Sequence, residues 1–218
     1  MKLRVWRLGV AVLCSLGLWS EGVLAMMPSP RVPSLEMAQG NGVEEFQRLF
    51  REGEQFFNQG TAQGYREAII RFEQVLAVAE RFGAINGVAL ASIFLGRSHE
   101  SLGEPQVALT YYQTALDASR EIEHREWEAA SLNNIGGVYD AWGNRSEALS
   151  YYHRALSTFQ DVGNRNGEAM TLTNIGMVYH ALGNRSEALN YYHQALLIAR
   201  EVGDRNEEAR TLNNIGEV

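Results

Sequence analysis

From residue 43 onward, apolar residues recur three and four positions apart along most of the chain, with polar residues between them. This spacing lays apolar side chains along one side of a helix, so it predicts amphipathic α-helices rather than strands. Two such stripes follow one another closely and predict a helix pair. Their members are Ile135, Val138, Tyr139 and Trp142, then Ala148, Leu149, Tyr152, Ala155, Leu156 and Phe159.

The same pattern is copied along the chain at a constant spacing of 40 in residue number. Repetition at a fixed period of 20 to 50 residues indicates a stacked array in which each unit buries its apolar face against its neighbours. The recurring positions are Ala68, Ala108, Ala148 and Ala188; Gly96, Gly136, Gly176 and Gly216; and the pairs Tyr111-Tyr112, Tyr151-Tyr152 and Tyr191-Tyr192.

The joints between helices carry the residues typical of helix ends. Glycine can supply the left-handed residue that closes a helix, and Asn or Asp three residues before Glu has the spacing of a capping box. The GNR and GDR triplets are therefore interpreted as turn signals. The residues concerned are Gly143, Asn144 and Glu147; Gly183, Asn184 and Glu187; and Gly203, Asp204 and Glu207.

Helices placed between these joints give a first pair at about 43–59 and 65–82. Further pairs are expected at 87–122, 127–162 and 167–202, with a partial unit at 206–218. The first pair is irregular, because Gly53 and Gly60 precede Gly96 and Gly103 by 43 positions whereas Ala68 keeps the spacing of 40 from Ala108. We expect the three extra residues in a loop from Gly60 to Gly64.

Residues 1–42 differ in composition from the repeats. A basic start, an apolar run of about 11 residues and small residues before position 26 predict a signal peptide at 1–25, cleaved after Ala25. A retained anchor is the alternative, but the run is shorter than the roughly 20 residues that span a bilayer. Residues 26–42, rich in Pro, Gly and Ser, are predicted to be a flexible linker. Export to the periplasm or the exterior follows from the signal peptide.

The net charge and the cysteine content exclude several classes of partner and site. The chain carries a net charge of −7, and removal of residues 1–25 takes three bases and one acid, which leaves −9. This charge argues against nucleic acid as a partner. The only cysteine, Cys14, lies in the predicted signal peptide, so the mature chain holds no disulfide and no cysteine metal site.

The residues of each unit resemble the tetratricopeptide repeat. That family places a small residue one turn before an aromatic in its first helix, then alanine, aromatic and alanine in its second. The matching residues are Gly136, Tyr139, Ala148, Tyr152 and Ala155, and then Gly176, Tyr179, Ala188, Tyr192 and Ala195. The resemblance implies a right-handed α-α superhelix of about four helix pairs plus an incomplete fifth repeat, and a protein that binds other proteins.

Two departures point to a particular branch of the family. The repeat period is 40, whereas about 34 residues is usual, and glycine stands where the second helix commonly ends in proline. Both features are similar to the repeats of kinesin light chain. HEAT-type repeats have a comparable period but not this placement of alanine and tyrosine.

The string TLNNIGxVYxxLG also resembles exported bacterial arrays, notably cyanobacterial, that often precede a CHAT protease-like domain. The chain stops midway through a first helix, so we expect a fragment or a truncated product. Two alternative functions follow: a sensor segment of a longer protease-like protein, or a structural array that self-associates through its uncapped end.

The resemblance also assigns residues to a peptide-binding groove along the first helices. The groove candidates are Asn133, Asn134, Asp140, Thr173, Asn174, His180, Asn213 and Asn214. Asparagine is unfavourable inside helices, so its repetition requires a cause. One interpretation is a ladder of carboxamides that binds the backbone of an extended peptide. The other is hydrogen bonding between neighbouring repeats, and the sequence alone does not separate the two.

Catalysis and metal binding find no support in the sequence. Neither a nucleophile elbow, a phosphate loop nor a His-Glu-x-x-His motif is present, so the chain is not expected to be an enzyme or to use a cofactor. His153 and His193 lie one repeat apart and are interpreted as packing residues rather than metal ligands. The tyrosine pairs are interpreted as packing between repeats, although Tyr111, Tyr151 and Tyr191 could line a surface.

Overall fold

A computed structural model describes residues 41–218 of the protein. The predicted signal peptide and all but the last two residues of the predicted linker lie outside the described residues. Within the described range the chain is helical throughout and contains no strand. The helices are α3 (Asn41–Phe57), α4 (Ala62–Arg81), α5 (Ile85–Ser101), α6 (Pro105–Glu121), α7 (Arg125–Ala141), α8 (Arg145–Val162), α9 (Arg165–Ala181), α10 (Arg185–Val202) and α11 (Arg205–Glu217).

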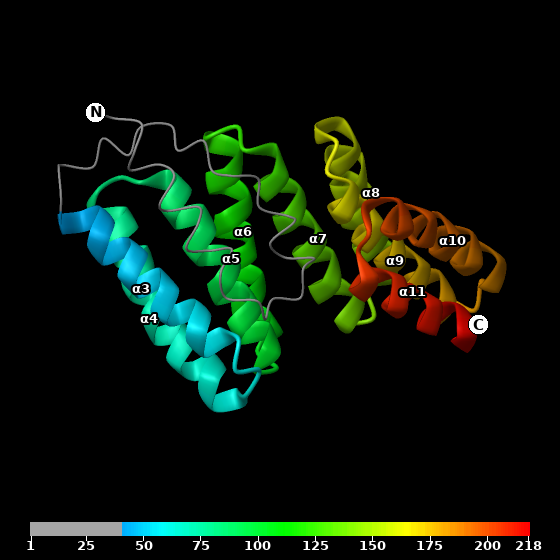
Figure 1. Ribbon diagram of the computed structural model, residues 1–218, viewed down its shortest axis with the longest axis horizontal. Coiled ribbons are helices and arrows are strands. Elements are labelled where there is room, and N and C mark those ends of the chain that lie inside the picture. The colour runs from blue at the N-terminus through cyan, green and yellow to red at the C-terminus, as the bar shows by residue number, and fades with distance from the viewer. Residues whose placement is uncertain (1–40) are drawn as a thin grey trace.

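The helices form consecutive pairs that stack into an array, from α3 and α4 at one end to α10 and α11 at the other (Figure 1). We number the pairs repeats 1 to 4, and α11 follows as a first helix. The first helices α5, α7, α9 and α11 also contact one another directly. Consecutive repeats are therefore closest on the side of their first helices, which makes this the inner side of the superhelix. The predicted all-α repeat architecture is confirmed.

Each repeat is held together by an aromatic ring that lies against a glycine of the first helix. A Cβ atom added at Gly136 would lie 2.8 Å from the ring of Tyr152, and one added at Gly96 would lie 2.5 Å from the ring of Tyr112. Such a separation is shorter than packed atoms tolerate, so a side chain at these positions would push the two helices apart. The glycine recurs because the ring occupies the space of its side chain.

The residues predicted to pack between helices do so with one exception. The alanines are fully buried, and the second tyrosine of each tyrosine pair is at most 3% exposed. Tyr139 and Tyr179 are partly buried against the same clusters. Gly216 is the exception: it lies in α11, the last helix of the described range, and nothing lies within 4 Å of its Cβ position. The buried members are Ala68, Gly96, Ala108, Gly136, Ala148, Tyr152, Ala155, Gly176, Ala188, Tyr192 and Ala195.

The predicted helix ends are largely confirmed, with one error. Gly143 and Gly183 have φ of 77° and 76°, the left-handed conformation expected of a closing glycine. The side chains of Asn184 and Asp204 accept hydrogen bonds from the backbone N–H groups of Glu187 and Glu207. Asn144 makes no such bond, because its side chain does not reach the N–H groups of the first turn of α8.

The three extra residues of repeat 1 do not form a loop. Gly60 adopts φ of 64°, and α4 begins at Ala62, two residues later, just as α6 begins two residues after Gly103. The insertion instead makes α4 20 residues long, against 17 for α6. Thr61 caps the longer helix by accepting a hydrogen bond from the backbone of Gly64 at 3.0 Å, so the predicted Gly60–Gly64 loop is wrong.

The glycine-ring contact predicts that Gly136→Ala lowers the free energy of unfolding by about 1–3 kcal/mol, the usual cost of overpacking a core. Gly137→Ala is the matched control. Its Cβ would have only the Tyr152 Oη at 3.6 Å and Glu100 Oε1 at 3.8 Å as neighbours. Thermal unfolding followed by circular dichroism should show a lower melting temperature for the first variant alone, and equal effects would contradict the packing account.

Glu123 is the one described residue other than glycine with positive φ, at 54°. It occupies the position that glycine takes in the other repeats, as at Gly83 and Gly163. A left-handed conformation costs an ordinary residue roughly 1–2 kcal/mol. Glu123→Gly is therefore expected to raise the free energy of unfolding by about 0.5–1 kcal/mol, measured by urea denaturation. The reverse change, Gly163→Glu, should lower it, and a neutral result for both would refute the strain.

Candidate functional site

The candidate site is the surface of the first helices that faces the inside of the superhelix. We call it the inner face and define it by positions 134, 137 and 140 of α7, by positions 97 and 100 of α5 and by positions 174, 177 and 180 of α9. These positions are three residues apart, so they lie along one side of each helix. The predicted groove residues fall on this face or beside it, at the contact between consecutive first helices.

Asn133 and Thr173 are buried at these contacts and do not reach the surface. Asn133 is 5% exposed, and its Oδ1 accepts hydrogen bonds from Thr171 Oγ1 at 3.2 Å and Asn174 Nδ2 at 3.1 Å. Thr173 is fully buried and donates to Glu207 Oε1 at 2.6 Å. Their assignment to a peptide groove is therefore wrong, because both side chains are used between repeats.

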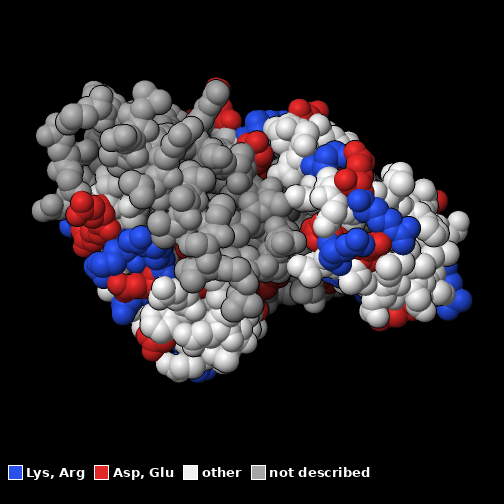
Figure 2. All heavy atoms as spheres, viewed as in Figure 1, with Lys and Arg blue, Asp and Glu red and all other residues white. Residues whose placement is uncertain are grey.

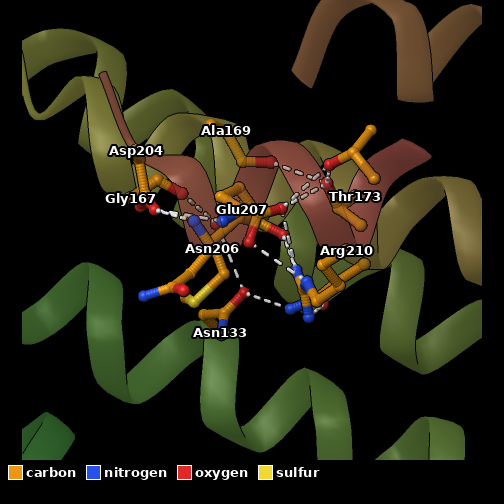
Figure 3. A network of polar contacts seen from close by, with 12 residues as sticks. Asn133, Gly167, Ala169, Thr173, Asp204, Asn206, Glu207 and Arg210 are labelled. Atoms are coloured by element: carbon orange, nitrogen blue, oxygen red, sulfur yellow. Dashed lines mark hydrogen bonds and ion pairs between the residues drawn. The ribbon is translucent and has the colours of Figure 1, made fainter. Parts of the chain in front are cut away.

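These bonds belong to one polar network that joins α7, α9 and α11 (Figure 3). Asn174, which donates to Asn133, accepts from Arg210 at 3.3 Å. Arg210 in turn forms an ion pair with Glu207 at 3.1 Å. Asn174 is thus partly exposed, but its amide hydrogen-bonds to α7 on one side and to α11 on the other. The interpretation of hydrogen bonding between repeats therefore holds for Asn174 as well.

The remaining groove candidates have different environments. Asn134, Asp140 and His180 are half-buried on the inner face. In α11, Asn213 is exposed and donates to Glu217 at 3.0 Å, while the Nδ2 of Asn214 is buried without a partner among the described residues. The structure therefore leaves Asn134, Asp140 and His180 available on the inner face and separates them from the two asparagines of α11.

Phenol hydroxyl groups and carboxylates meet on the inner face. In repeat 2, Tyr112 donates its hydroxyl proton to Glu100 Oε2 at 2.6 Å. Burial raises the pKa of Tyr152 well above its ordinary value, and the negative charges of Asp140 and Glu100 raise it further. Burial also raises the pKa of Asp140, an effect that the positive charge of Arg145 opposes. The centre of this face is therefore acidic and only partly hydrated.

Ion pairs tie the edge of the array where one repeat passes into the next. Glu128 binds Arg125 at 2.6 Å and Arg120 at 3.0 Å. The same arrangement recurs at Glu208, which binds Arg205 at 2.9 Å and Arg200 at 2.8 Å. The arginine of the GDR triplet, Arg205, is thus an ion-pair partner as well as part of a turn. This extends the interpretation of the triplets as turn signals alone.

The outer tyrosines pack within the array. Tyr151 stacks on Tyr139 with ring centroids 5.4 Å apart, and Tyr191 stacks on Tyr179 at the same distance. His153 lies 6.3 Å from the ring of Tyr191, across the boundary between repeats. Tyr151 and Tyr191 are thus partly buried and stack within their own repeats, whereas His153 is exposed.

Other kinds of site are absent from the part of the chain that the structure describes. Over residues 41–218 no group of three or more His, Cys, Asp or Glu side chains is placed to hold a metal ion. None of the helices in that range is both long and apolar enough to cross a membrane. Figure 2 shows arginine and acidic side chains next to one another over α3 and around α11 rather than in separate patches.

A family model described as tetratricopeptide repeat matches residues 87–161 and 167–218. The matched segments make up more than half of the chain. The chain belongs to the tetratricopeptide repeat family. No curated protein matches it significantly.

Solved structures with the same repeat fold have low sequence identity to this tetratricopeptide array. Aspartyl phosphate phosphatase F from Bacillus subtilis superposes with a TM-score of 0.72 at 15% identity, over 79% of this chain and 45% of its own. A Rap protein complexed with competence and sporulation factor gives 0.69 at 17% identity, over 82% and 49%. The kinesin light chain-like repeats from Podospora anserina give 0.58 at 18%, over 78% and 88%. The array spans less than half the length of the first two proteins.

Several residues of the inner face were missed by sequence reasoning. Glu100, Gly137 and the hydroxyl group of Tyr152 meet there, although they come from two different repeats. A comparison of the repeats position by position would have singled out Gly137, since Arg97 and Met177 are its equivalents. The ion pair between Arg210 and Glu207 is not copied in the earlier repeats, so the repeat pattern carried no signal for it.

The polar network predicts unequal effects for two adjacent asparagines. Asn133→Ala removes the shared acceptor of Thr171 and Asn174, so we expect a loss of about 1–2 kcal/mol in the free energy of unfolding. Asn134→Ala, one residue away and half-buried, should change it by less than about 0.5 kcal/mol. Urea denaturation of both variants measures the difference, and a large loss for Asn134→Ala would assign that residue to the stack instead.

Proposed function

We propose that this protein is a non-catalytic interaction module that binds an extended peptide or protein segment along the inner face. Asn134 carries the proposal: it presents a half-buried amide on the inner face, between Gly137 and the network that fixes Asn133. A carboxamide can both donate to and accept from a peptide backbone. An amide at this position would bind a segment with little demand on its side chains.

Two further observations support binding on this face. Ion pairs and the polar network lock consecutive repeats together, so the face is rigid before a partner arrives, which lowers the entropy cost of binding. The Rap protein with the same fold was solved in complex with competence and sporulation factor. Proteins of this family typically act as scaffolds. If the predicted signal peptide operates, the interaction takes place outside the cytoplasmic membrane.

A selection of random twelve-residue peptides against the purified protein tests this function. Peptides selected on the unchanged protein are then measured on the double variant Asn134→Ala with His180→Ala, which lacks two half-buried side chains of the inner face. A loss of about 1.4 kcal/mol in the binding free energy corresponds to a tenfold larger Kd. We expect a loss of about this size for selected peptides, measured by fluorescence anisotropy.

Leu197→Ser is the matched control, because Leu197 is 70% exposed on the second helix α10. This control should leave the Kd of the same peptides within about twofold, since it changes no inner-face residue. Peptides that lose affinity with Leu197→Ser and keep it with the double variant would move the binding surface to the second helices. They would overturn the proposal.

A further inference from the structure

Position 137 differs from its equivalents in a way that opens a notch on the inner face. The same position carries Arg97 in repeat 2 and Met177 in repeat 4, but glycine in repeat 3. A Cβ atom built on Gly137 would have two neighbours, Tyr152 Oη at 3.6 Å and Glu100 Oε1 at 3.8 Å. Both are oxygen atoms at ordinary contact distance, so the missing side chain leaves a space bordered by a phenol and a carboxylate.

Repeat 2 shows how the equivalent position is occupied when a side chain is present. The guanidinium group of Arg97 lies 4.8 Å from the ring centroid of Phe57. The charges of Tyr112 and Glu100 act on Arg97 and oppose the lowering of its pKa by burial. Tyr112 and Glu100 are themselves joined by a hydrogen bond of 2.6 Å. A cation therefore accompanies a phenol-carboxylate pair in this repeat.

Repeat 3 has the phenol and the carboxylate but not the cation. Tyr152 corresponds to Tyr112 and Asp140 to Glu100, each one repeat later, while Gly137 replaces the arginine. Aspartate is one methylene shorter than glutamate. Tyr152 is 3% exposed, and its hydroxyl group hydrogen-bonds to none of the described residues. The hydroxyl oxygen itself is not enclosed and lies beside the Gly137 Cβ position, so it is open to a hydrogen-bond partner in the notch.

The atoms that border the notch are hydrogen-bond acceptors and favour a positively charged donor. Glu100 borders it directly, and the negative charges of Asp140 and Glu100 both act on Tyr152. Three arginines offset part of this charge: Arg97 interacts with Glu100, Arg210 with Tyr152 and Arg145 with Asp140. Arg210 is already paired with Glu207, so its charge is largely neutralised. The atoms that border the notch are thus a carboxylate oxygen and a phenol oxygen at a partly buried place, where ion pairs are stronger than in water.

We propose that the Gly137 notch binds an arginine side chain of the segment that occupies the inner face. The guanidinium group would take the place that Arg97 fills in repeat 2, with Glu100 Oε1, the Asp140 carboxylate and Tyr152 Oη as acceptors. Arginine fits better than lysine because its planar group donates to several acceptors at once. The proposal rests on the proposed function and adds the chemistry of the bound segment.

The test uses a nine-residue peptide of Ser, Gly and Ala with one central arginine, acetylated and amidated. Its counterpart carries citrulline, which has nearly the same shape but no charge. We expect the arginine peptide to shift the amide NMR signal of Gly137 and to bind about tenfold more tightly than the citrulline peptide. Asp140→Asn should remove most of this difference, and added salt should reduce it.

Substitutions that place a side chain in the notch test the proposal directly. Gly137→Arg copies repeat 2 and Gly137→Met copies repeat 4, so each places a side chain that this fold already accommodates at the equivalent position. Both should abolish the preference for arginine, and circular dichroism checks that they remain folded. If Gly137→Arg does not fold, Gly137→Met carries the test. Full arginine-peptide affinity in either folded variant would overturn the proposal.

The peptide results also separate this inference from the proposed function. Equal binding of the arginine and citrulline peptides would support the inner face as a peptide site and refute the notch. No binding of either peptide at millimolar concentration would refute the notch, and the selected twelve-residue peptides would then decide the proposed function independently.

Discussion

The structure depends on the contact between one glycine of each first helix and the aromatic ring of the following second helix. The ring of Tyr152 lies so close to Gly136 that no side chain fits between them. This contact sets the separation of the two helices, and the separation determines where the next pair can pack. The same contact recurs between Gly96 and Tyr112, so a repeated geometry follows from a repeated pair of residues.

A second constraint acts between repeats, and it is polar. The chain of hydrogen bonds from Asn133 through Asn174 to Arg210 crosses three first helices. Buried polar groups that are fully satisfied fix one arrangement of the surrounding helices, whereas half-satisfied ones destabilise it. Two of the asparagines that resembled a binding ladder, Asn133 and Asn174, therefore hold the repeats in register, whereas Asn134 takes no part in these bonds.

Chemical differences between the repeats arise where the pattern is broken. The residues that repeat faithfully are buried and make similar contacts each time, so they cannot distinguish one part of the inner face from another. The variable positions are Arg97, Gly137 and Met177, and they give each repeat a different charge and depth at the same place. A segment bound along the array would thus meet a cation, a notch and an apolar side chain in turn.

The sequence by itself determined the helices, their pairing and the period, because apolar spacing and closing glycines such as Gly143 act through local geometry. It did not determine which polar residues pair across repeats. Asn133 and Asn134 are identical and adjacent, yet the first is buried against Thr171 and the second lies on the inner face. That difference depends on a rotation of about 100° per residue around the helix and on the exact position of the neighbouring helix, which only tertiary packing sets.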